Sequence, residues 1–365
     1  MRSLRVIVSG GGTGGHIFPA IAIAQEIQRR FPSAAILFVG AHGRMEMQKV
    51  PEAGFEIKGL NIAGFQRGAL VPNLLLPFKV VRSLLQAYRV IKQFRPDVTV
   101  GVGGYASGPV LLVSSLLGVP AIIQEQNSYA GITNKILGRF VRKVCVAYDN
   151  MEKYFPSQKI VVTGNPVRSS IYATNLSKES ACRFWGLDSA KPVLLAVGGS
   201  LGARTINESI FAEVEKLVSK NIQLIWQTGR NYFPGYSHLG QKYPLLRVIE
   251  FIKDMDKAYA AADVIISRAG ALSIAELQLA GKPAILVPSP NVAEDHQTHN
   301  AMALALRNAA IVVKDSEARD KLVTTAVDLL ANNDLQRELS ENIKKMAIHN
   351  ASERIVDVLL KEIQQ

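Results

Sequence analysis

The sequence predicts an α/β protein made of two Rossmann-like domains, each built on a parallel sheet. Three observations predict this fold. Short apolar runs rich in β-branched residues alternate along the chain with longer helical patterns. A buried strand, a glycine turn and an amphipathic helix occur twice, in VIVSGGGTGGHIFPAIAIAQEI and in LLAVGGSLGARTINESIFAEV. The chain has 365 residues, 48% of them hydrophobic, which is enough for two domains of roughly 150 to 200 residues each.

Each half of the chain is expected to contribute its own set of strands. In the first half we expect strands at residues 4–9, 35–39, 98–102, 121–124, 144–147 and 160–163. In the second half we expect them at residues 193–198, 223–227, 247–251, 264–267, 284–287 and 311–313. The halves join near TGNPVR, residues 163–168, and the less patterned residues 169–191. Because open α/β sheets bind ligands at the carboxyl ends of their strands, we expect the site in a cleft between the domains.

The first glycine turn raises the question of a dinucleotide. Gly10, Gly12 and Gly15 satisfy GxGxxG, a pattern that is weak on its own. A dinucleotide fold also requires an acid at the end of the second strand, where residues 40–42 read Gly-Ala-His. A Walker A phosphate loop is excluded because no Gly-Lys-Ser/Thr follows. The sequence therefore argues against an NAD-dependent oxidoreductase.

The same turn retains the general anion affinity of glycine N–H groups and of a helix N-terminus. These groups favour a diphosphate without any metal. The apolar spacing predicts a helix that begins just past His16, with Pro19 in its first turn. For this turn and for the second one, GGSLGA, the alternative is a tight strand-to-helix connection with no ligand.

A second group of candidate residues lies in residues 263–288, DVIISRAGALSIAELQLAGKPAILVP. Ser273 and Glu276 have the spacing of a capping box, which is the structural interpretation. In the functional interpretation, Glu276 accepts both hydroxyls of a ribose while neighbouring N–H groups hold phosphate. The polar residues 291–300, NVAEDHQTHN, follow the next strand and suit either sugar hydroxyls or a solvated loop.

No metal site is expected. Asp254 and Asp256 spell DxD, which carries a divalent cation in some sugar-nucleotide enzymes. Their position between a strand and KAYAAAD is better explained by helix capping. Cys145 and Cys182 have no metal-ligand spacing and indicate ordinary thiols in a reducing compartment.

The positive charge lies almost entirely in the first half of the chain. Residues 1–160 hold 19 Lys and Arg against 8 Asp and Glu, whereas residues 161–365 hold 23 against 22. Within the first half, residues 57–96 contain seven basic residues and no acidic one. The helical spacing of this segment brings its basic residues Arg82, Arg89 and Lys92 within about a quarter turn of one another, beside a broad apolar surface.

A basic and apolar helix of this kind predicts binding to an anionic membrane surface, with residues 74–78, LLLPF, as a candidate insertion loop. The alternative is a packed helix with a solvated basic edge. Nucleic acid is not expected as a partner because no binding motif is present. The N-terminus enters a strand at once and no apolar run reaches about 18 residues, so we expect a protein that is neither exported nor membrane-spanning.

Eight motifs, in order along nearly the whole chain, closely resemble the MurG family of glycosyltransferases. They are GGGTGGHIFPAIAIA, GVGGYASGP, QEQNSYAGITNK, TGNPVR, GGSLGARTIN, EFIKDM, SRAGALSIAE and EDHQTHNA. The resemblance implies a GT-B architecture and an inverting transfer of N-acetylglucosamine from UDP-N-acetylglucosamine to lipid I, without a cofactor or a tightly bound metal. It also implies a peripheral enzyme on the cytoplasmic face of the bacterial plasma membrane.

The family assigns the acceptor mainly to the N-terminal domain and the donor mainly to the C-terminal one. We place the acceptor- and membrane-binding domain at residues 1–163 and the UDP-sugar domain at residues 164–345. Residues 346–365 are expected to form a helix that packs back on the first domain.

Carried over position by position, the resemblance implies binding residues on both domains. On the N-terminal side, Thr13, Gly14 and Gly15 line the site and Asn127 contacts the donor. Gln124 stands where the family often has His.

On the C-terminal side, the resemblance implies that Arg168 and Ser200 contact the nucleotide and that Ile252 presents its backbone to the uracil. Gln297 would reach the sugar hydroxyls, with Thr298 as the alternative register. Phosphate and ribose would be held by a continuous run, Ala271, Leu272, Ser273, Ile274, Ala275 and Glu276.

The chemistry requires a base near the 4-hydroxyl of N-acetylmuramic acid and stabilisation of the departing UDP. His16 and Glu125 are the candidate bases, and His16 could equally hold the diphosphate of the acceptor. Ser200 and the turn before Glu276 would stabilise the leaving group. A UDP-sugar 2-epimerase, another GT-B glycosyltransferase and a non-catalytic membrane scaffold remain as alternatives.

Overall fold

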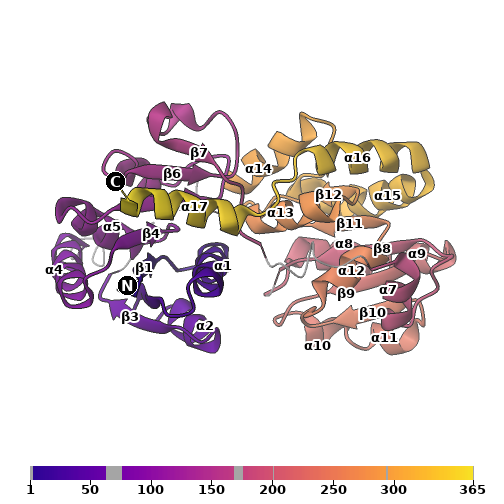
Figure 1. The fold of residues 1–365 in the computed structure, drawn as a ribbon. Coiled ribbons are helices and arrows are strands. Elements are labelled where there is room, and N and C mark those ends of the chain that lie inside the picture. Colours follow the sequence, from indigo (N-terminus) through magenta and orange to yellow (C-terminus); the bar gives the residue numbers. More distant parts are fainter. Residues whose placement is uncertain (1–2, 63–75, 168–175, 200, 293–294, 365) are drawn as a thin grey trace. The chain divides into compact units, whose positions relative to one another are not determined.

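Parallel strand pairs organise both halves of the chain (Figure 1). The computed structural model describes every residue except 1–2, 63–75, 168–175, 200, 293–294 and 365. The chain forms two units, one made of Met1–Val167 with His349–Gln365 and the other of Arg168–Ile348. Below they are called the N-terminal and C-terminal units.

The N-terminal unit contains a seven-stranded sheet in the order β3-β2-β1-β4-β5-β6-β7. Every neighbouring pair in it is parallel. Its strands are β1 Arg5–Ser9, β2 Ala35–Ala41, β3 Glu56–Leu60, β4 Val98–Gly101, β5 Ala121–Glu125, β6 Lys143–Val146 and β7 Ile160–Val162.

The C-terminal unit repeats the plan with a six-stranded parallel sheet in the order β10-β9-β8-β11-β12-β13. Its strands are β8 Val193–Val197, β9 Gln223–Gln227, β10 Leu246–Ile249, β11 Val264–Ser267, β12 Ala284–Leu286 and β13 Ile311–Val312. Both sheets therefore have a doubly wound order. Successive strands are added toward one edge of the sheet up to β3 or β10, and the remaining strands are added toward the other edge, starting next to β1 or β8. The predicted class, two Rossmann-like domains of GT-B type, is confirmed.

Helices connect the strands. In the N-terminal unit they are α1 Gly14–Arg30, α2 Glu46–Glu52, α4 Leu76–Phe94, α5 Ser107–Leu116, α6 Ile132–Leu137, η1 Met151–Lys153, η2 Ser157–Lys159 and α17 Ala351–Gln364. In the C-terminal unit they are α7 Lys178–Trp185, α8 Arg204–Ala212, α9 Val214–Ser219, α10 Phe233–Tyr236, α11 Leu239–Lys242, α12 Met255–Ala261, α13 Ala271–Ala280, α14 His296–Ala305, η5 Asp315–Glu317, α15 Ala318–Ala331 and α16 Asn333–Lys345.

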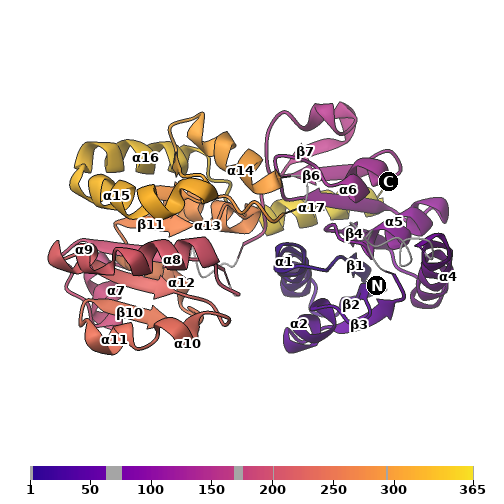
Figure 2. The ribbon, with the colours of Figure 1, turned by 180° about the vertical axis from the view of Figure 1, so that it is seen from behind.

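The alternation of side chains along each central strand divides the core into two layers. In β1, Val6 and Val8 pack with α1 and α17, whereas Ile7 faces the opposite layer with α4, α5 and α6. Figure 2 shows α4, α5 and α6 from behind. In β8, Leu194 packs with α8, α9 and α15, and Leu195 with α7, α12, α13 and α14. Both sheets are covered on both faces, as parallel sheets require.

All the predicted strands are present, with ends that differ by two residues or fewer. One strand, β3, was not predicted. It lies at the edge of the sheet, and of its residues Glu56–Leu60 only Leu60 is buried. Its sequence EIKGL therefore lacks the continuous apolar run that identified the central strands.

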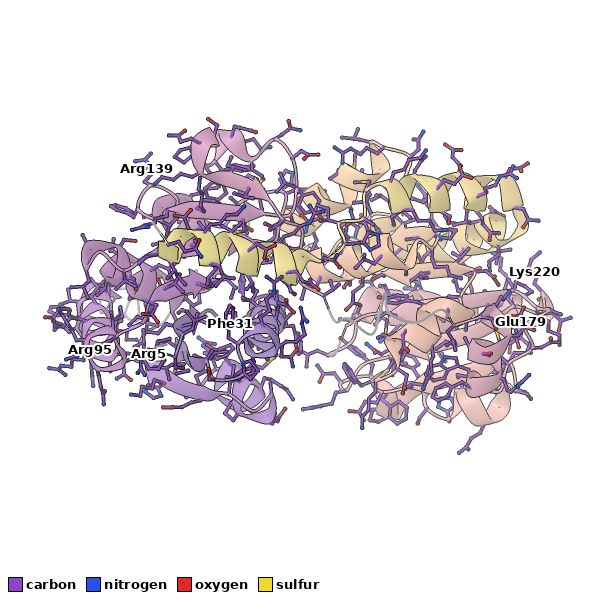
Figure 3. The ribbon with its side chains drawn as sticks, viewed as in Figure 1. Arg5, Phe31, Arg95, Arg139, Glu179 and Lys220 are labelled. Carbon is purple, nitrogen blue, oxygen red and sulfur yellow. The ribbon has the colours of Figure 1, made fainter. Side chains whose placement is uncertain are left out.

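The basic helix α4 is anchored to the sheet at its C-terminal end. Nε of Arg5, a residue labelled in Figure 3, donates to the carbonyl oxygen of Phe94 at 2.7 Å. The Arg5 guanidinium lies 4.4 Å from the centre of the Phe94 ring. The N–H of Arg5 donates to Asp97 at 2.8 Å. Leu76–Phe78, predicted to belong to an insertion loop, form the first turn of α4 instead, and Leu74 and Leu75 lie outside the described residues.

Candidate active site

Each sheet has its switch point next to its first strand. In the N-terminal unit the chain runs outward in opposite directions from β1 and β4, and in the C-terminal unit from β8 and β11. Loops at the carboxyl ends of such strand pairs form the binding crevice of open α/β sheets. Both predicted glycine turns, and the turn before α13, lie at these positions.

The first glycine turn leads into α1 earlier than the sequence predicted. The helix begins at Gly14 with Thr13 at the N-cap, so His16 is its third residue and Pro19 lies inside it. The prediction that the helix starts past His16 was wrong because its first two residues, Gly14 and Gly15, are poor helix formers and gave no helical signal. His16 therefore lies on the first turn of α1.

Glycine residues allow the first glycine turn, GGGTGGH, to pack directly against the loop after β4. A Cβ atom on Gly104 would lie 2.3 Å from the carbonyl oxygen of Gly11, and one on Gly10 would lie 2.2 Å from Cγ2 of Val102. A Cβ atom on Gly103 would lie 2.9 Å from the His16 ring. These distances are shorter than real Cβ atoms allow. Gly104 therefore lets its backbone approach that of Gly11, and Gly10 and Gly103 leave room for the side chains of Val102 and His16.

His16 is oriented by the glycine turn. Its Nδ1 atom lies 3.2 Å from the carbonyl oxygen of Gly11 and 3.3 Å from Oγ1 of Thr13. Because a carbonyl oxygen only accepts, a hydrogen bond to Gly11 requires the proton on Nδ1, and the Thr13 hydroxyl then accepts from the same atom. In the neutral ring this tautomer leaves the lone pair on Nε2, the atom a general base needs.

Glu46 in α2 reaches back to the same turn and was not identified from the sequence. Its side chain is buried, and its two oxygens accept hydrogen bonds from the N–H groups of Gly12, at 2.8 Å, and Ala41, at 3.0 Å. Dinucleotide folds carry an acidic residue at the end of the second strand, here residues 40–42, where none is present. Glu46 lies a few residues after that strand, and its carboxylate accepts a hydrogen bond from the backbone of the glycine turn itself.

Glu125, the second candidate base, is buried at the end of β5 and accepts four hydrogen bonds. They come from the N–H and the side-chain amide of Asn127, at 3.0 and 3.3 Å, the N–H of Gly131, at 3.1 Å, and the side-chain amide of Asn134, at 2.9 Å. Burial raises the pKa of Glu125, and these hydrogen bonds act in the opposite direction. Glu125 holds the loop that presents Asn127.

Gln124, where the related family often has His, lies inside a buried amide network. Its side-chain amide donates to Asn165 at 2.9 Å, and the Asn165 amide donates to the carbonyl oxygen of Gln126 at 2.9 Å. Gln126 donates in turn to the side-chain oxygen of Gln124 and, at 2.8 Å, to the carbonyl oxygen of Val102. This network joins the motif QEQN to TGNPVR and to the loop after β4.

The second glycine turn packs against the loop after β9. A Cβ atom on Gly202 would lie 2.1 Å from the carbonyl oxygen of Thr228, and one on Gly229 would lie 2.0 Å from the Gly202 nitrogen. Gln227 connects the turn to Ile252, since its amide donates to the carbonyl oxygen of Gly199 at 3.0 Å and its oxygen accepts from the Ile252 N–H at 2.8 Å. Within the C-terminal unit, Gln227 therefore links two predicted donor-binding segments.

The turn before α13 differs from the predicted capping box. The helix starts at Ala271 with Gly270 at the N-cap, so Ser273 is its third residue and Glu276 its sixth. The spacing was misleading because the glycine, without a capping side chain, begins the helix three residues earlier. Glu276 is instead held by the hydroxyl of Tyr259 in α12, which donates to its carboxylate at 2.9 Å.

Of the polar residues 291–300, which follow β12, His296–Asn300 form the start of helix α14, and residues 293–294 lie outside the described residues. Asp295 is the N-cap, and Gln297 is the second residue of the helix. The side-chain oxygen of Gln297 accepts from the N–H of Ser289 at 2.9 Å, and Thr298 donates to Asp295 at 2.7 Å. Gln297 therefore fixes the loop that follows β12.

Two predicted nucleotide contacts, Arg168 and Ser200, lie outside the described residues. Among the residues that the structure does describe, no three His, Cys, Asp or Glu side chains gather as they would around a metal ion. Asp254 precedes α12 at the N-cap position, but its side chain binds Nζ of Lys257 at 2.7 Å and makes no cap bond. Asp256 lies in the first turn of that helix, where its charge complements the helix dipole.

Comparison with known proteins agrees with this architecture. Residues 6–146 match the glycosyltransferase family 28 N-terminal domain, and residues 193–355 match the glycosyltransferase family 28 C-terminal domain. Two curated relatives, from Parabacteroides distasonis and Cytophaga hutchinsonii, are 52% and 54% identical to this chain. The alignments cover 100% of both chains in the first case, and 98% of this chain and 97% of the relative in the second.

Both relatives are named "UDP-N-acetylglucosamine--N-acetylmuramyl-(pentapeptide) pyrophosphoryl-undecaprenol N-acetylglucosamine transferase". Among solved structures, Acinetobacter baumannii MurG superimposes with a TM-score of 0.80 at 31% identity, covering 98% of this chain and 99% of that one. The matched domains, the full-length relatives and the two doubly wound sheets agree. The chain belongs to glycosyltransferase family 28 and, within it, to the MurG family.

Proposed function

We propose that this chain transfers N-acetylglucosamine from UDP-N-acetylglucosamine to the 4-hydroxyl of the N-acetylmuramic acid in lipid I, an undecaprenyl-diphosphate-linked acceptor, to give lipid II for peptidoglycan synthesis. The observation that carries the proposal is identity above 50% over the full length to transferases that carry this name. Glycine turns at the switch points of both sheets support it, since each suits a diphosphate.

The acceptor is assigned mainly to the N-terminal unit and the donor mainly to the C-terminal unit. In this assignment Thr13, Gly14 and Gly15 line the acceptor side and Asn127 contacts the donor from that unit. Ile252 offers its carbonyl oxygen to the uracil, because its N–H already donates to Gln227.

The remaining donor contacts are assigned to the C-terminal unit as well. Arg168 and Ser200 contact the nucleotide, Gln297 the sugar, and the run Ala271–Glu276 the phosphate and ribose. Position supports this last contact, because α13 begins directly after β11 at the switch point of its sheet, and the positive end of a helix dipole attracts anions.

His16 is the better-placed base of the two candidates. Its contact with the Gly11 carbonyl favours the tautomer that has the proton on Nδ1 and the lone pair on Nε2. Glu125 is buried, and four N–H donors already occupy its carboxylate. A base in that setting would have to break hydrogen bonds to reach a substrate, so we assign Glu125 the role of holding Asn127 and its loop.

The reaction is then a single displacement. Nε2 of His16 takes the proton of the 4-hydroxyl as its oxygen attacks the anomeric carbon from the face opposite UDP. The bond between that carbon and the diphosphate oxygen breaks, and UDP leaves with the electron pair. Inversion converts the α-linked donor into a β-linked product. Preorganised N–H donors would stabilise the leaving diphosphate; one donor to a developing oxyanion is worth roughly 2.7 to 4 kcal/mol in acyl-transfer enzymes.

Helix α4 supplies a surface suited to an anionic membrane, which is where the acceptor lies. Its exposed stripe combines apolar and basic side chains: Phe78, Val81, Arg82, Leu85, Tyr88, Arg89 and Lys92. Val81 is 58% exposed and Leu85 56%. Ser83, Ala87 and Ile91 pack inward, which leaves the stripe without a role in the core. Below this set is called the α4 surface.

We propose that the α4 surface binds anionic lipid at the cytoplasmic face of the plasma membrane and brings the site to lipid I. Apolar burial and attraction to anionic headgroups act together at such surfaces. Among the helices of the described residues, none has the length and apolar character that a membrane-spanning helix needs.

Incubation of the pure protein with labelled UDP-N-acetylglucosamine, with and without a lipid I analogue, tests the activity. The proposal predicts label in the lipid only when the acceptor is present. Conversion of the donor to another UDP-sugar without any acceptor would identify a 2-epimerase instead. An intact donor under both conditions would support a non-catalytic membrane scaffold.

A further inference from the structure

One peptide group of the first glycine turn is hydrogen-bonded at both of its ends. The carbonyl oxygen of Gly11 faces Nδ1 of His16 at 3.2 Å. The N–H of Gly12, which belongs to the same peptide group, donates to Oε2 of Glu46 at 2.8 Å. A carboxylate, a peptide and an imidazole thus form a continuous chain of hydrogen bonds.

The structure leaves specific room for the Glu46 side chain. A Cβ atom on Gly11 would lie 2.2 Å from its carboxyl carbon, and one on Gly40 would lie 2.5 Å from its Cγ atom. Its second oxygen accepts the N–H of Ala41, and the side chain is only 1% exposed. A side chain at Gly11 or Gly40 would therefore displace Glu46. Both carboxylate oxygens of Glu46 accept hydrogen bonds from backbone N–H groups.

The negative charge of Glu46 at one end of this series of hydrogen bonds affects His16 at the other end. A carboxylate that accepts from a peptide N–H polarises the peptide, which makes its carbonyl oxygen a stronger acceptor. The stronger acceptor at Gly11 favours the proton on Nδ1 of His16 and stabilises positive charge on the ring. The aspartate of a serine protease acts on its histidine in this way, but by direct contact.

We propose that Glu46 is a positioning residue for His16 and acts on it through the Gly11–Gly12 peptide. It fixes the tautomer that leaves Nε2 as the base, and it stabilises the imidazolium formed when Nε2 takes the acceptor's proton. The hydroxyl of Thr13, 3.3 Å from Nδ1, is the second neighbour of that atom. This inference rests on the proposed function, in which His16 is the base.

Glu46→Gln tests the proposal, because the amide has the size of the carboxylate but lacks its charge. Its NH2 group also cannot accept from an N–H. The matched control is Glu52→Gln, the same change on the same helix at an exposed carboxylate that pairs with Lys49. Glu46→Gln should lower kcat about tenfold, the equivalent of about 1.4 kcal/mol. The KM for UDP-N-acetylglucosamine should stay within twofold, because most donor contacts are assigned to the other unit and Glu46 bonds to Gly12 and Ala41.

The tautomer of His16 gives a second readout that needs no turnover. Nitrogen-15 NMR of the neutral rings, with the His16 signal identified among the six histidines by comparison with His16→Ala, distinguishes Nδ1–H from Nε2–H. The wild-type chain and Glu52→Gln should show Nδ1–H, and Glu46→Gln should shift toward Nε2–H. A wild-type ring protonated on Nε2 would overturn the proposal even if Glu46→Gln does not fold.

The proposed transferase activity and the role of Glu46 can be contradicted separately. Absence of transfer by the wild-type chain contradicts the proposed function, while the NMR result still decides whether Glu46 sets the tautomer. Normal transfer combined with an unchanged tautomer and an unchanged kcat in folded Glu46→Gln contradicts the role of Glu46 alone. A drop in kcat equal to that of Glu52→Gln would also contradict it.

Discussion

At the scale of single residues, we assign proton transfer and most of donor binding to residues of different units. His16 is on the first turn of α1 in the N-terminal unit, whereas Glu276 is on α13 in the C-terminal unit. Substitutions at the two positions should therefore affect different kinetic constants.

His16→Ala should abolish most turnover and leave donor binding nearly intact. Loss of a general base costs about 10² to 10⁴ in rate. Titration calorimetry with UDP-N-acetylglucosamine and a transfer assay with a lipid I analogue measure the two quantities. A loss of donor affinity comparable to the loss of turnover would show that His16 belongs to the donor site.

Glu276→Ala should show the opposite behaviour, with the donor dissociation constant rising about tenfold or more. The estimate assumes the loss of one hydrogen bond to a charged group, worth about 1.5 kcal/mol or more. Tyr259→Phe, which removes the hydroxyl that holds Glu276, should weaken donor binding in the same direction by a smaller factor. Unchanged donor affinity in both variants would reduce Glu276 to a structural residue of α13.

How far residues could be predicted depended on how local their signals are. The glycines and His16 stand in one contiguous motif, so their proximity was readable from the chain. Glu46 and Tyr259 have no motif of their own, and only the fold brings them to Gly12 and Glu276. The capping box at Ser273 was wrong because its spacing is equally compatible with a helix that begins at Ala271, with Gly270 as the N-cap.

At the scale of elements, α4 and α17 carry predictions that do not involve the reacting groups. The spacing of Arg82, Arg89 and Lys92 was predicted to place them together beside apolar residues. The structure confirms that these three and their apolar neighbours Val81 and Leu85 are exposed.

Neutralising Arg82, Arg89 and Lys92 together to Gln should weaken binding to vesicles that contain anionic lipid by about 100-fold. Each basic residue near such a surface contributes about 1 kcal/mol, and 1.4 kcal/mol is tenfold. The matched control neutralises Lys220, Lys314 and Lys345, three exposed lysines of the C-terminal unit; Lys220 is labelled in Figure 3. Equal vesicle binding by both triple variants in a sedimentation assay would exclude the α4 surface as the docking site.

Helix α17 packs against α1 through charged residues as well as through the core. Glu26 accepts hydrogen bonds from Arg29, at 2.7 Å, and from Arg30, which also pairs with Asp357 on α17. The hydrogen bond from Arg29, together with that from Arg30, lowers the pKa of Glu26 despite its burial. A lowered pKa in the folded state means that the carboxylate stabilises the protein at neutral pH.

Glu26→Gln should therefore lower the free energy of unfolding at pH 7. The difference in free energy of unfolding between the wild-type chain and Glu26→Gln should shrink as the pH falls through the lowered pKa of Glu26, because the wild-type carboxylate then becomes protonated. Urea unfolding of both chains at several pH values measures this. The control Glu208→Gln, which breaks the exposed ion pair with Arg204, should change stability by less than about 1 kcal/mol. A deficit independent of pH would contradict the role of the Glu26 charge.

Elements were predictable where burial is continuous. Central strands such as β8 and β11 are buried along nearly their whole length and were predicted within a residue. The edge strand β3, with Glu56 exposed and only Leu60 buried, carries too little apolar pattern to be distinguished from a loop. The start of α1 was displaced because Gly14 and Gly15 have low helix propensity, and the fold overrides it.

At the scale of the whole molecule, the chain repeats one doubly wound plan, with a glycine turn at each switch point. The repeat was predictable because each half begins with the same strand, glycine turn and helix. One turn leads to His16, and the other is joined through Gln227 to Ile252. We assign the acceptor to the first turn and the donor to the second, because a transferase must hold both substrates at once.

The identity and configuration of the product test the central claim most directly. The wild-type chain is incubated with UDP-N-acetylglucosamine and a lipid I analogue in the presence of EDTA, and the lipid is analysed by mass spectrometry and proton NMR. The account predicts an acceptor heavier by one N-acetylhexosamine, joined through a β-linkage to the 4-hydroxyl of N-acetylmuramic acid. An acceptor of unchanged mass, an α-linked sugar, or transfer that EDTA abolishes would contradict it.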